Sequence, residues 1–324
     1  MDNITHSLVG LMLARAGLDR GAKGAAVMLM LAANAPDMDI VAGLTGALSY
    51  LDVHRGYTHA LPFAPLAALV PLLAVKLITR TQITLGAYLG CLVAVLSHLL
   101  LDWTNVYGIR LLLPFSSKWF HLDSTDIVDP VILLILLSAL AAPALVALVS
   151  SEIGSRKVGG PKRGWAWFAL LTLTAYDAGR WVAHERALSV IDAHEYMGKP
   201  ALKVYAFPAR FSLFDWRGVV YGDGFVYELP VDLSKDLNAE AGQFSYPSGP
   251  SPDLDAARMT RPFQAFERFN QVPFWRLSPV VDAVKVELID LRFGSPAHPG
   301  FEAVANVEHD GRVADARFTF GDPR

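Results

Sequence analysis

The sequence has little charge. Only 18% of its 324 residues are Asp, Glu, Lys or Arg, against roughly 25% in ordinary soluble domains. The 28 basic and 31 acidic residues give a formal net charge of -3, which excludes the strong positive field of a nucleic-acid-binding protein. The single cysteine, Cys91, excludes an internal disulfide framework. A hydrophobic fraction of 53% and a mean hydropathy of +0.34 exclude a disordered chain and argue against a wholly soluble one.

The shortage of charge is confined to one part of the chain. Residues 1–184 hold 13 basic and 11 acidic residues, about 13%, whereas residues 185–324 hold 15 basic and 20 acidic residues, about 25%. This division predicts a membrane-embedded helical bundle over 1–184 and a soluble β or α+β domain over 185–324.

Several apolar segments approach the roughly 20 residues that a membrane-spanning helix needs. We expect four spans: Ala60–Ile78, Ile83–Leu101, Val131–Val149 and Trp165–Val182. The last is the weakest, because it contains Asp177 and Arg180. Two N-terminal helices, Asn3–Arg15 and Ala22–Ala33, are too short to span alone.

Basic residues in the short loops predict the orientation, because such residues favour the cytoplasmic side. Lys76 and Arg80 separate the first two spans, and Arg156, Lys157, Lys162 and Arg163 separate the last two. We therefore expect a multi-pass protein whose C-terminal domain is extracytoplasmic. The N-terminus lacks the basic region of a cleavable signal peptide.

Histidine and aspartate gather at the opposite ends of the expected helices, where ionisable residues usually mark function. His98 and Asp102 are four residues apart and share one helix face, as two metal ligands on a helix do. The candidates in this group are His6, Asp37, Asp39, His54, His59, His98 and Asp102. Imidazole and carboxylate together suit zinc, manganese or iron. Seven candidates exceed one tetrahedral zinc site, and two ions bridged by an Asp would use them.

Structural roles are the alternatives for individual members of this group. A lone histidine in an apolar span is more often a core residue. The interpretation of His98 as a metal ligand therefore depends on Asp102 and on the other polar segments. His6 can cap a helix, and Asp39 can be a helix-start residue favoured by the helix dipole.

The same polar segments resemble a known family. They are Asp2–Gly10 (DNITHSLVG), Ala35–Asp39 (APDMD), His54–Ala60 (HRGYTHA), His98–Gly108 (HLLLDWTNVYG), and Pro114-Phe115 followed by Asp123 and Asp129-Pro130. Over about residues 1–185 the chain resembles the YdjM-like inner-membrane, metal-dependent hydrolases of bacteria and archaea. A more distant likeness is to the helical zinc-dependent phospholipase C group.

The resemblance implies a location and a set of site residues. It implies the bacterial or archaeal inner membrane, and as metal ligands His6, Asp37, His54, His59, His98 and Asp102. It implies that Asp39, Asp123 and Asp129 are ligands or support the ligands. No role is carried over to His121 or Asp126, where the family pattern is looser.

Short alternating runs in the last 140 residues predict strands. These runs are Leu202–Phe207, Arg217–Tyr221, Phe225–Pro230, Val284–Phe293, Phe301–Glu308 and Val313–Phe320. Asp310-Gly311 is a hairpin signal between the last two. Pro262–Trp275 is expected to begin as a helix that packs on the sheet.

These observations favour a membrane-bound, metal-dependent hydrolase. A divalent metal, with zinc favoured, would activate water for attack on a phosphoester or acyl centre. Arg55 would neutralise substrate charge, and Asp39 or Asp123 would orient water or move a proton. The expected partners are membrane lipids and a small-molecule or lipid-linked substrate, with no nucleic acid; the oligomeric state is not indicated.

Two other functions stay open at this point. One is a non-enzymatic metal-binding transporter or sensor, and the other is a structural membrane protein. A transporter places its ligands near the bilayer midplane on broken helices, whereas these ligands gather at one end of the bundle.

Overall fold

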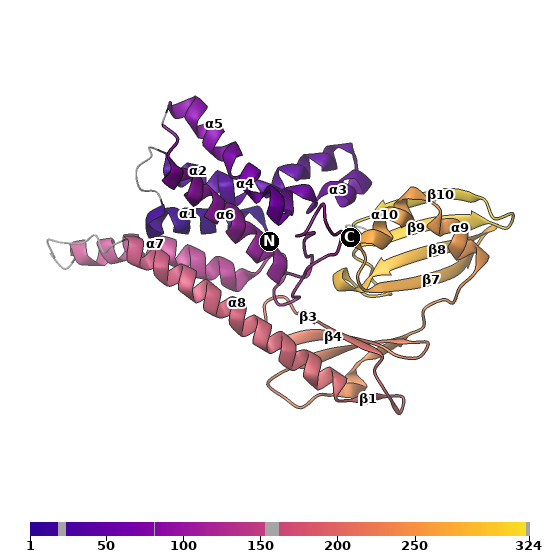
Figure 1. Cartoon of the computed structure of the whole chain (residues 1–324). Coiled ribbons are helices and arrows are strands. Elements are labelled where there is room, and N and C mark those ends of the chain that lie inside the picture. The colour runs from indigo at the N-terminus through magenta and orange to yellow at the C-terminus, as the bar shows by residue number, and fades with distance from the viewer. Residues whose placement is uncertain (19–23, 81, 153–161, 322–324) are drawn as a thin grey trace. The chain divides into compact units, whose positions relative to one another are not determined.

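The computed structural model describes residues 1–18, 24–80, 82–152 and 162–321 (Figure 1). The chain forms two compact units. Unit 1 contains Met1–Asp39, Arg55–Ala183 and Arg210–Leu213, and unit 2 contains Ile40–His54, His184–Ala209 and Phe214–Arg324. By contacts, therefore, Ile40–His54 groups with the C-terminal part and Arg210–Leu213 with the N-terminal part. The expected domains 1–184 and 185–324 remain a prediction.

Unit 1 is helical. Its helices are α1 (Asn3–Leu13), α2 (Ala25–Ala33), α4 (Ala64–Ala67), α5 (Leu69–Thr79), α6 (Leu85–Thr104), α7 (Pro130–Glu152) and the part of α8 (Lys162–Asp192) up to Ala183. Side chains fix several of the starts. Asp2 accepts hydrogen bonds from the backbone of Ile4 and Thr5 at the start of α1, and Thr84 accepts one from Ala87 at the start of α6. Such caps satisfy backbone donors that have no partner within the helix.

Three helical segments in the described residues are long and apolar enough to cross a membrane: Leu61–Thr79, Leu85–Thr104 and Pro130–Ser150. A fourth candidate is the pair formed by α2 and the 3-10 helix η2 (Pro36–Thr45), which is bent by 56°. The predicted fold class, membrane helices followed by a β-rich domain, is confirmed.

The fourth candidate differs from the one expected. Trp165–Val182 lies inside α8, which does not qualify as a span because charged and polar residues interrupt its apolar run. The predicted orientation also rests on Arg156 and Lys157, which lie outside the described residues. The number of crossings and the orientation therefore stay predictions.

The close packing of α1 on α2 depends on Gly10. A Cβ atom at this position would lie 2.7 Å from the carbonyl oxygen of Leu29 and 2.9 Å from the Cα of Met30. The absent side chain lets the two backbones approach, and His6 lies one turn earlier on the same face of α1. Leu29 and Cys91 are fully buried in the core that α2 and α6 form.

Unit 2 contains two four-stranded antiparallel sheets. One has the order β3-β4-β5-β6, with β3 (Lys203–Pro208), β4 (Asp215–Tyr221), β5 (Val226–Asp232) and β6 (Gln243–Ser245). The other has the order β10-β9-β8-β7, with β7 (Pro273–Val280), β8 (Ala283–Asp290), β9 (Glu302–Glu308) and β10 (Val313–Thr319). A minimal hairpin pairs β1 (Glu195–Tyr196) with β2 (Lys199–Pro200). The six predicted strands are present, with small shifts at their ends.

Three short helices belong to unit 2: α3 (Ala47–Val53), α9 (Pro252–Arg258) and α10 (Arg261–Phe269). The expected helix at Pro262–Trp275 ends at Phe269, and β7 begins at Pro273. Helix α10 buries three phenylalanines, Phe263, Phe266 and Phe269. Helix α3 packs against α10 and β10, where Asp52 pairs with Arg268 at 3.0 Å and with Arg261 at 3.5 Å.

Replacing Gly10 with alanine tests the close packing of α1 and α2. Alanine in a helix is normally favoured over glycine by about 1 kcal/mol, but overpacking costs about 1–3 kcal/mol. We expect G10A to lower the melting temperature of the detergent-solubilised protein. The matched control is G179A on α8, where a Cβ meets nothing within 4 Å, and it should leave the melting temperature equal or higher. Equal melting temperatures for G10A and the wild type would contradict this packing.

Candidate metal centre

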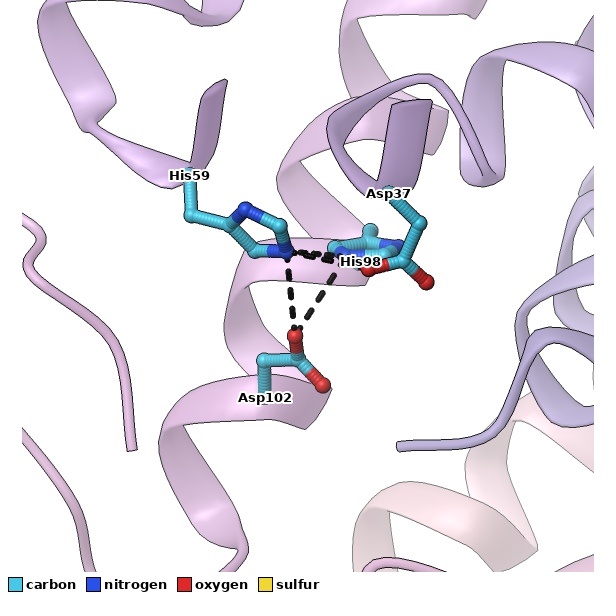
Figure 2. Close-up of side chains that lie close together, drawn as sticks. All are labelled: Asp37, His59, His98 and Asp102. Carbon is cyan, nitrogen blue, oxygen red and sulfur yellow. Dashed lines mark hydrogen bonds and ion pairs between the residues drawn. The ribbon is translucent and has the colours of Figure 1, made fainter. Parts of the chain in front are cut away.

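Four side chains of unit 1 converge on one point: Asp37, His59, His98 and Asp102 (Figure 2). One ligand atom from each lies within 4.8 Å of the other three, and all four residues are buried. Asp37 lies near the start of η2, directly after α2 ends. His59 ends the 3-10 turn η3 (Tyr57–His59), and His98 and Asp102 lie one turn apart near the C-terminal end of α6.

Both histidines present Nε2 to the centre, because a partner fixes each Nδ1. The carbonyl oxygen of Ala33 lies 2.7 Å from Nδ1 of His98 and can only accept, so this Nδ1 carries the proton. Nδ1 of His59 lies 3.0 Å from Thr58 Oγ1 and 3.3 Å from Asp39 Oδ2. Such outer contacts orient metal-binding histidines and leave the Nε2 lone pair available.

The distances between these atoms fit a metal ion. The two Nε2 atoms are 3.1 Å apart. Nε2 of His59 is 3.2 Å from Asp37 Oδ1 and 3.4 Å from Asp102 Oδ2, and for His98 the corresponding distances are 3.7 and 3.3 Å. Zinc–ligand bonds of about 2.0–2.1 Å in a tetrahedron require ligands about 3.3 Å apart. Oδ2 of Asp102 is buried and has no hydrogen-bond partner among the described residues, as expected of an atom reserved for a cation.

The other oxygen of Asp102 faces a different set of partners. Oδ1 contacts the α-amino group of Met1, and it lies 3.2 Å from Nη2 of Arg55 and 3.2 Å from Nδ2 of Asn105. Arg55 also donates from Nη1 to Asn105 Oδ1 at 3.1 Å and to the Gly108 carbonyl at 3.2 Å. The guanidinium of Arg55 is thus buried and holds Asp102.

His6 lies beside this cluster. Its ring stacks on that of His98 with centroids 3.7 Å apart, and its Nε2 is 3.4 Å from Asp102 Oδ1. Neither ring nitrogen has a hydrogen-bond partner among the described residues. Burial, and then the neighbouring His98, lowers the pKa of His6 well below its usual value, which favours the neutral ring. A neutral imidazole whose nitrogens make no hydrogen bond among the described residues is chemically able to bind a metal ion.

The comparisons with known proteins cover the part of the chain that holds these residues. The model of the family described as "YdjM inner membrane protein" matches residues 1–187. This chain belongs to that family. The "Uncharacterized protein YfhP" of Bacillus subtilis (strain 168) is 27% identical over 327 residues, which cover 96% of this chain and 92% of the relative. No solved structure matches the chain.

Besides His6, Arg55 and Asp129, three further predicted site residues lie outside the four-residue cluster: Asp39, His54 and Asp123. Asp39 is occupied by the backbone N–H of Arg55 at 3.1 Å and by the Thr58 hydroxyl at 2.5 Å, so it supports His59 from behind. His54 follows α3 in unit 2 and stacks on Tyr50 at 4.4 Å, and its role as a ligand stays a prediction.

The third of these residues, Asp123, lies beside the end of α6. The residues on either side of it, Leu122 and Ser124, donate backbone hydrogen bonds to Trp103 and Thr104. Asp123 Oδ2 lies 2.9 Å from Nδ1 of His121, and its Oδ1 is buried without a hydrogen-bond partner in the described chain. Asp129 has a structural role, because it caps α7 and accepts a hydrogen bond from Tyr176 at 2.8 Å.

Sequence reasoning missed two side chains that contact this candidate centre, Asn105 and Thr58. Asn105 follows Asp102 by three residues, the spacing that places it near the same helix face, and this signal was available. Thr58 directly precedes His59, and no spacing in the sequence indicates that its hydroxyl contacts the ring of His59. The Ala33 carbonyl that orients His98 comes from a helix end 65 positions away, and no sequence pattern points to it.

Substituting Asp39 with asparagine tests the support of His59. Asparagine keeps the size but removes the negative charge near Nδ1, and loss of such an outer partner typically costs 10–100-fold in metal affinity. We expect D39N to bind zinc about 10–100-fold more weakly than the wild type, measured by competition with a chelating indicator. The control, D223N, removes an exposed carboxylate of unit 2 and should leave the affinity unchanged. A D39N protein with wild-type zinc affinity would show that Asp39 does not support a metal ligand.

Proposed function

We propose that the protein is a membrane-bound, metal-dependent hydrolase. The observation that carries this proposal is the convergence of two histidine Nε2 atoms and two carboxylates, all buried, with each Nδ1 fixed by a partner. A purely structural polar cluster would satisfy its own hydrogen bonds, whereas the two Nε2 atoms lie 3.1 Å apart and Asp102 Oδ2 has no hydrogen-bond partner among the described residues.

The residues around the centre have different roles in the proposed reaction. A divalent cation, with zinc favoured by the ligand set, supplies Lewis acidity when it is bound. Arg55 and Asn105 hold Asp102 in place, and Asp39 and the Ala33 carbonyl hold the two histidine rings. The surrounding apolar core excludes bulk water and strengthens these electrostatic interactions.

Two of the predicted catalytic roles change. Arg55 is engaged with Asp102, so we assign it to positioning the ligand rather than to clamping a substrate. Oδ2 of Asp39 accepts from Arg55 and Thr58 and lies 3.3 Å from Nδ1 of His59, so we assign Asp39 to orienting that ring. Asp123 keeps a buried Oδ1 without a partner in the described residues, and we assign to it the acceptance of a proton from water.

A phosphoester of a lipid or a lipid-linked molecule is the substrate class that we propose. His98 and Asp102 lie in the last two turns of α6, an apolar helix of membrane-spanning length. Ligands near the end of such a helix lie at headgroup depth, which suits a phosphoester presented by lipids. The same position favours a hydrolase over a transporter, whose site lies near the bilayer midplane.

The D102N and H98A variants test the proposed activity. We expect the purified protein to hydrolyse phosphodiester substrates in the presence of zinc or manganese, and each variant to lose both bound metal and metal-dependent turnover. Metal content is measured by elemental mass spectrometry, and turnover by release of the alcohol and the phosphomonoester that hydrolysis of a phosphodiester produces. The control is H309A, at an exposed position in the turn between β9 and β10, which should retain both. Full metal content in D102N and H98A would count against this centre.

The location of unit 2 is a further part of the proposal. From the basic residues Lys76 and Arg80, and Lys162 and Arg163, we infer that α8 crosses the bilayer although polar residues interrupt its apolar run, so that the residues after it are extracytoplasmic. An alkaline phosphatase fused to the C-terminus should then be active in cells, because this reporter folds only outside the cytoplasm. The matched fusion to a cytoplasm-dependent fluorescent protein should be dark. The reverse pattern would overturn the orientation.

A further inference from the structure

Two loops of unit 1 leave large apolar side chains exposed. Phe115 (85% exposed) and Val128 (50%) lie in the connection between α6 and α7, and Phe211 (84%) and Leu213 (44%) lie in the segment Arg210–Leu213. We call these four residues the interfacial patch. Single exposed apolar residues are common, but here each loop combines an exposed phenylalanine with an exposed base, Lys118 or Arg210.

The segment Arg210–Leu213 is held firmly at its place on the bundle. Nη1 of Arg180 donates to the carbonyl of Leu213 at 2.7 Å, and Nε of the same side chain donates to the carbonyl of Ser124 at 3.0 Å. Arg210 Nε lies 3.0 Å from Asp126 Oδ2. One buried arginine on α8 thus bridges the two loops, so their exposed side chains belong to one end of the bundle.

The start of α7 indicates how deep in the membrane this end of the helical bundle lies. Asp129 caps α7 by accepting from the backbone of Val131 and Ile132, and the apolar span begins at Pro130. Asp126 and Val128 precede this start by only a few residues. A segment tied to Asp126 therefore lies where hydrocarbon gives way to headgroups, the zone that aromatic and basic side chains prefer.

We propose that the interfacial patch inserts Phe211 and Leu213 into the headgroup layer of the bilayer. Burial of an exposed phenylalanine or leucine removes apolar surface from water, and the neighbouring Arg210 can reach lipid phosphates. This proposal extends the proposed function, because it places a lipid surface at the end of the bundle where α6 carries the metal ligands. It is tested without any measurement of turnover, so it can fail independently of the hydrolase activity.

The test uses a nitroxide spin label at position 211. Cys91 is fully buried, so the wild type is the control for unwanted labelling, and F211C adds one exposed thiol. The labelled protein is placed in vesicles of phosphatidylcholine and phosphatidylglycerol, and collision rates are measured with oxygen and with a water-soluble nickel chelate. We expect the ratio of oxygen to nickel collisions at F211C to lie between that of L137C on the exposed face of α7 and that of a water-exposed position. H309C, in the exposed turn between β9 and β10, is the water reference.

Two results would overturn the proposal. Free access of the nickel chelate to F211C would place residue 211 in water. Low access of both reagents would mean that protein, from another molecule or a second copy, covers the patch. A second variant, L213C, repeats the measurement in case the label at 211 disturbs the loop.

Discussion

The carboxylate of Asp102 has no access to water, and the arrangement of unit 1 around it follows from that constraint. A buried charge is tolerated only when it is paired and hydrogen-bonded. Oδ1 has the guanidinium of Arg55, the amide of Asn105 and the amino group of Met1, while Oδ2 faces the two histidine rings. The two oxygens thus separate a support network from the ligand cluster. Three segments far apart in sequence must meet for either side to form.

Spacing predicted the part of the candidate site that lies on one helix, and its role in binding metal stays a prediction. The i, i+4 relation of His98 and Asp102 placed both on one face of α6, and the structure brings Asp37 and His59 to them. The membrane helices followed from long apolar runs, and the C-terminal strands from alternation. The bent pair of α2 and η2 was not predicted, because each half is too short to register as a span. Strand β7 was missed because Pro273 and Pro279 interrupt its alternation.

The sequence could not decide among the roles open to Arg55 and Asp39, because the choice depends on tertiary contacts. In the sequence, an arginine beside a histidine motif suggests an anion clamp, and an aspartate two residues from a ligand suggests a base. In the structure Arg55 contacts Asp102, and Asp39 contacts His59. The YdjM family and the buried His/Asp cluster together describe a membrane protein with a site that can bind metal. Catalysis is inferred only from the chemistry of the residues in the cluster.

The contacts of helix α3 affect the order in which parts of the chain can pack during synthesis. Its ion pairs join Asp52 to Arg261 and Arg268, partners 209 and 216 positions later in the chain. Asp37 and His59 flank this part of the chain on either side. A ribosome releases the flanking residues early, but the partners of α3 emerge only after α8 and the first sheet have been made. The stretch between Asp37 and His59 therefore reaches its final packing late in synthesis, although it is among the first to be translated.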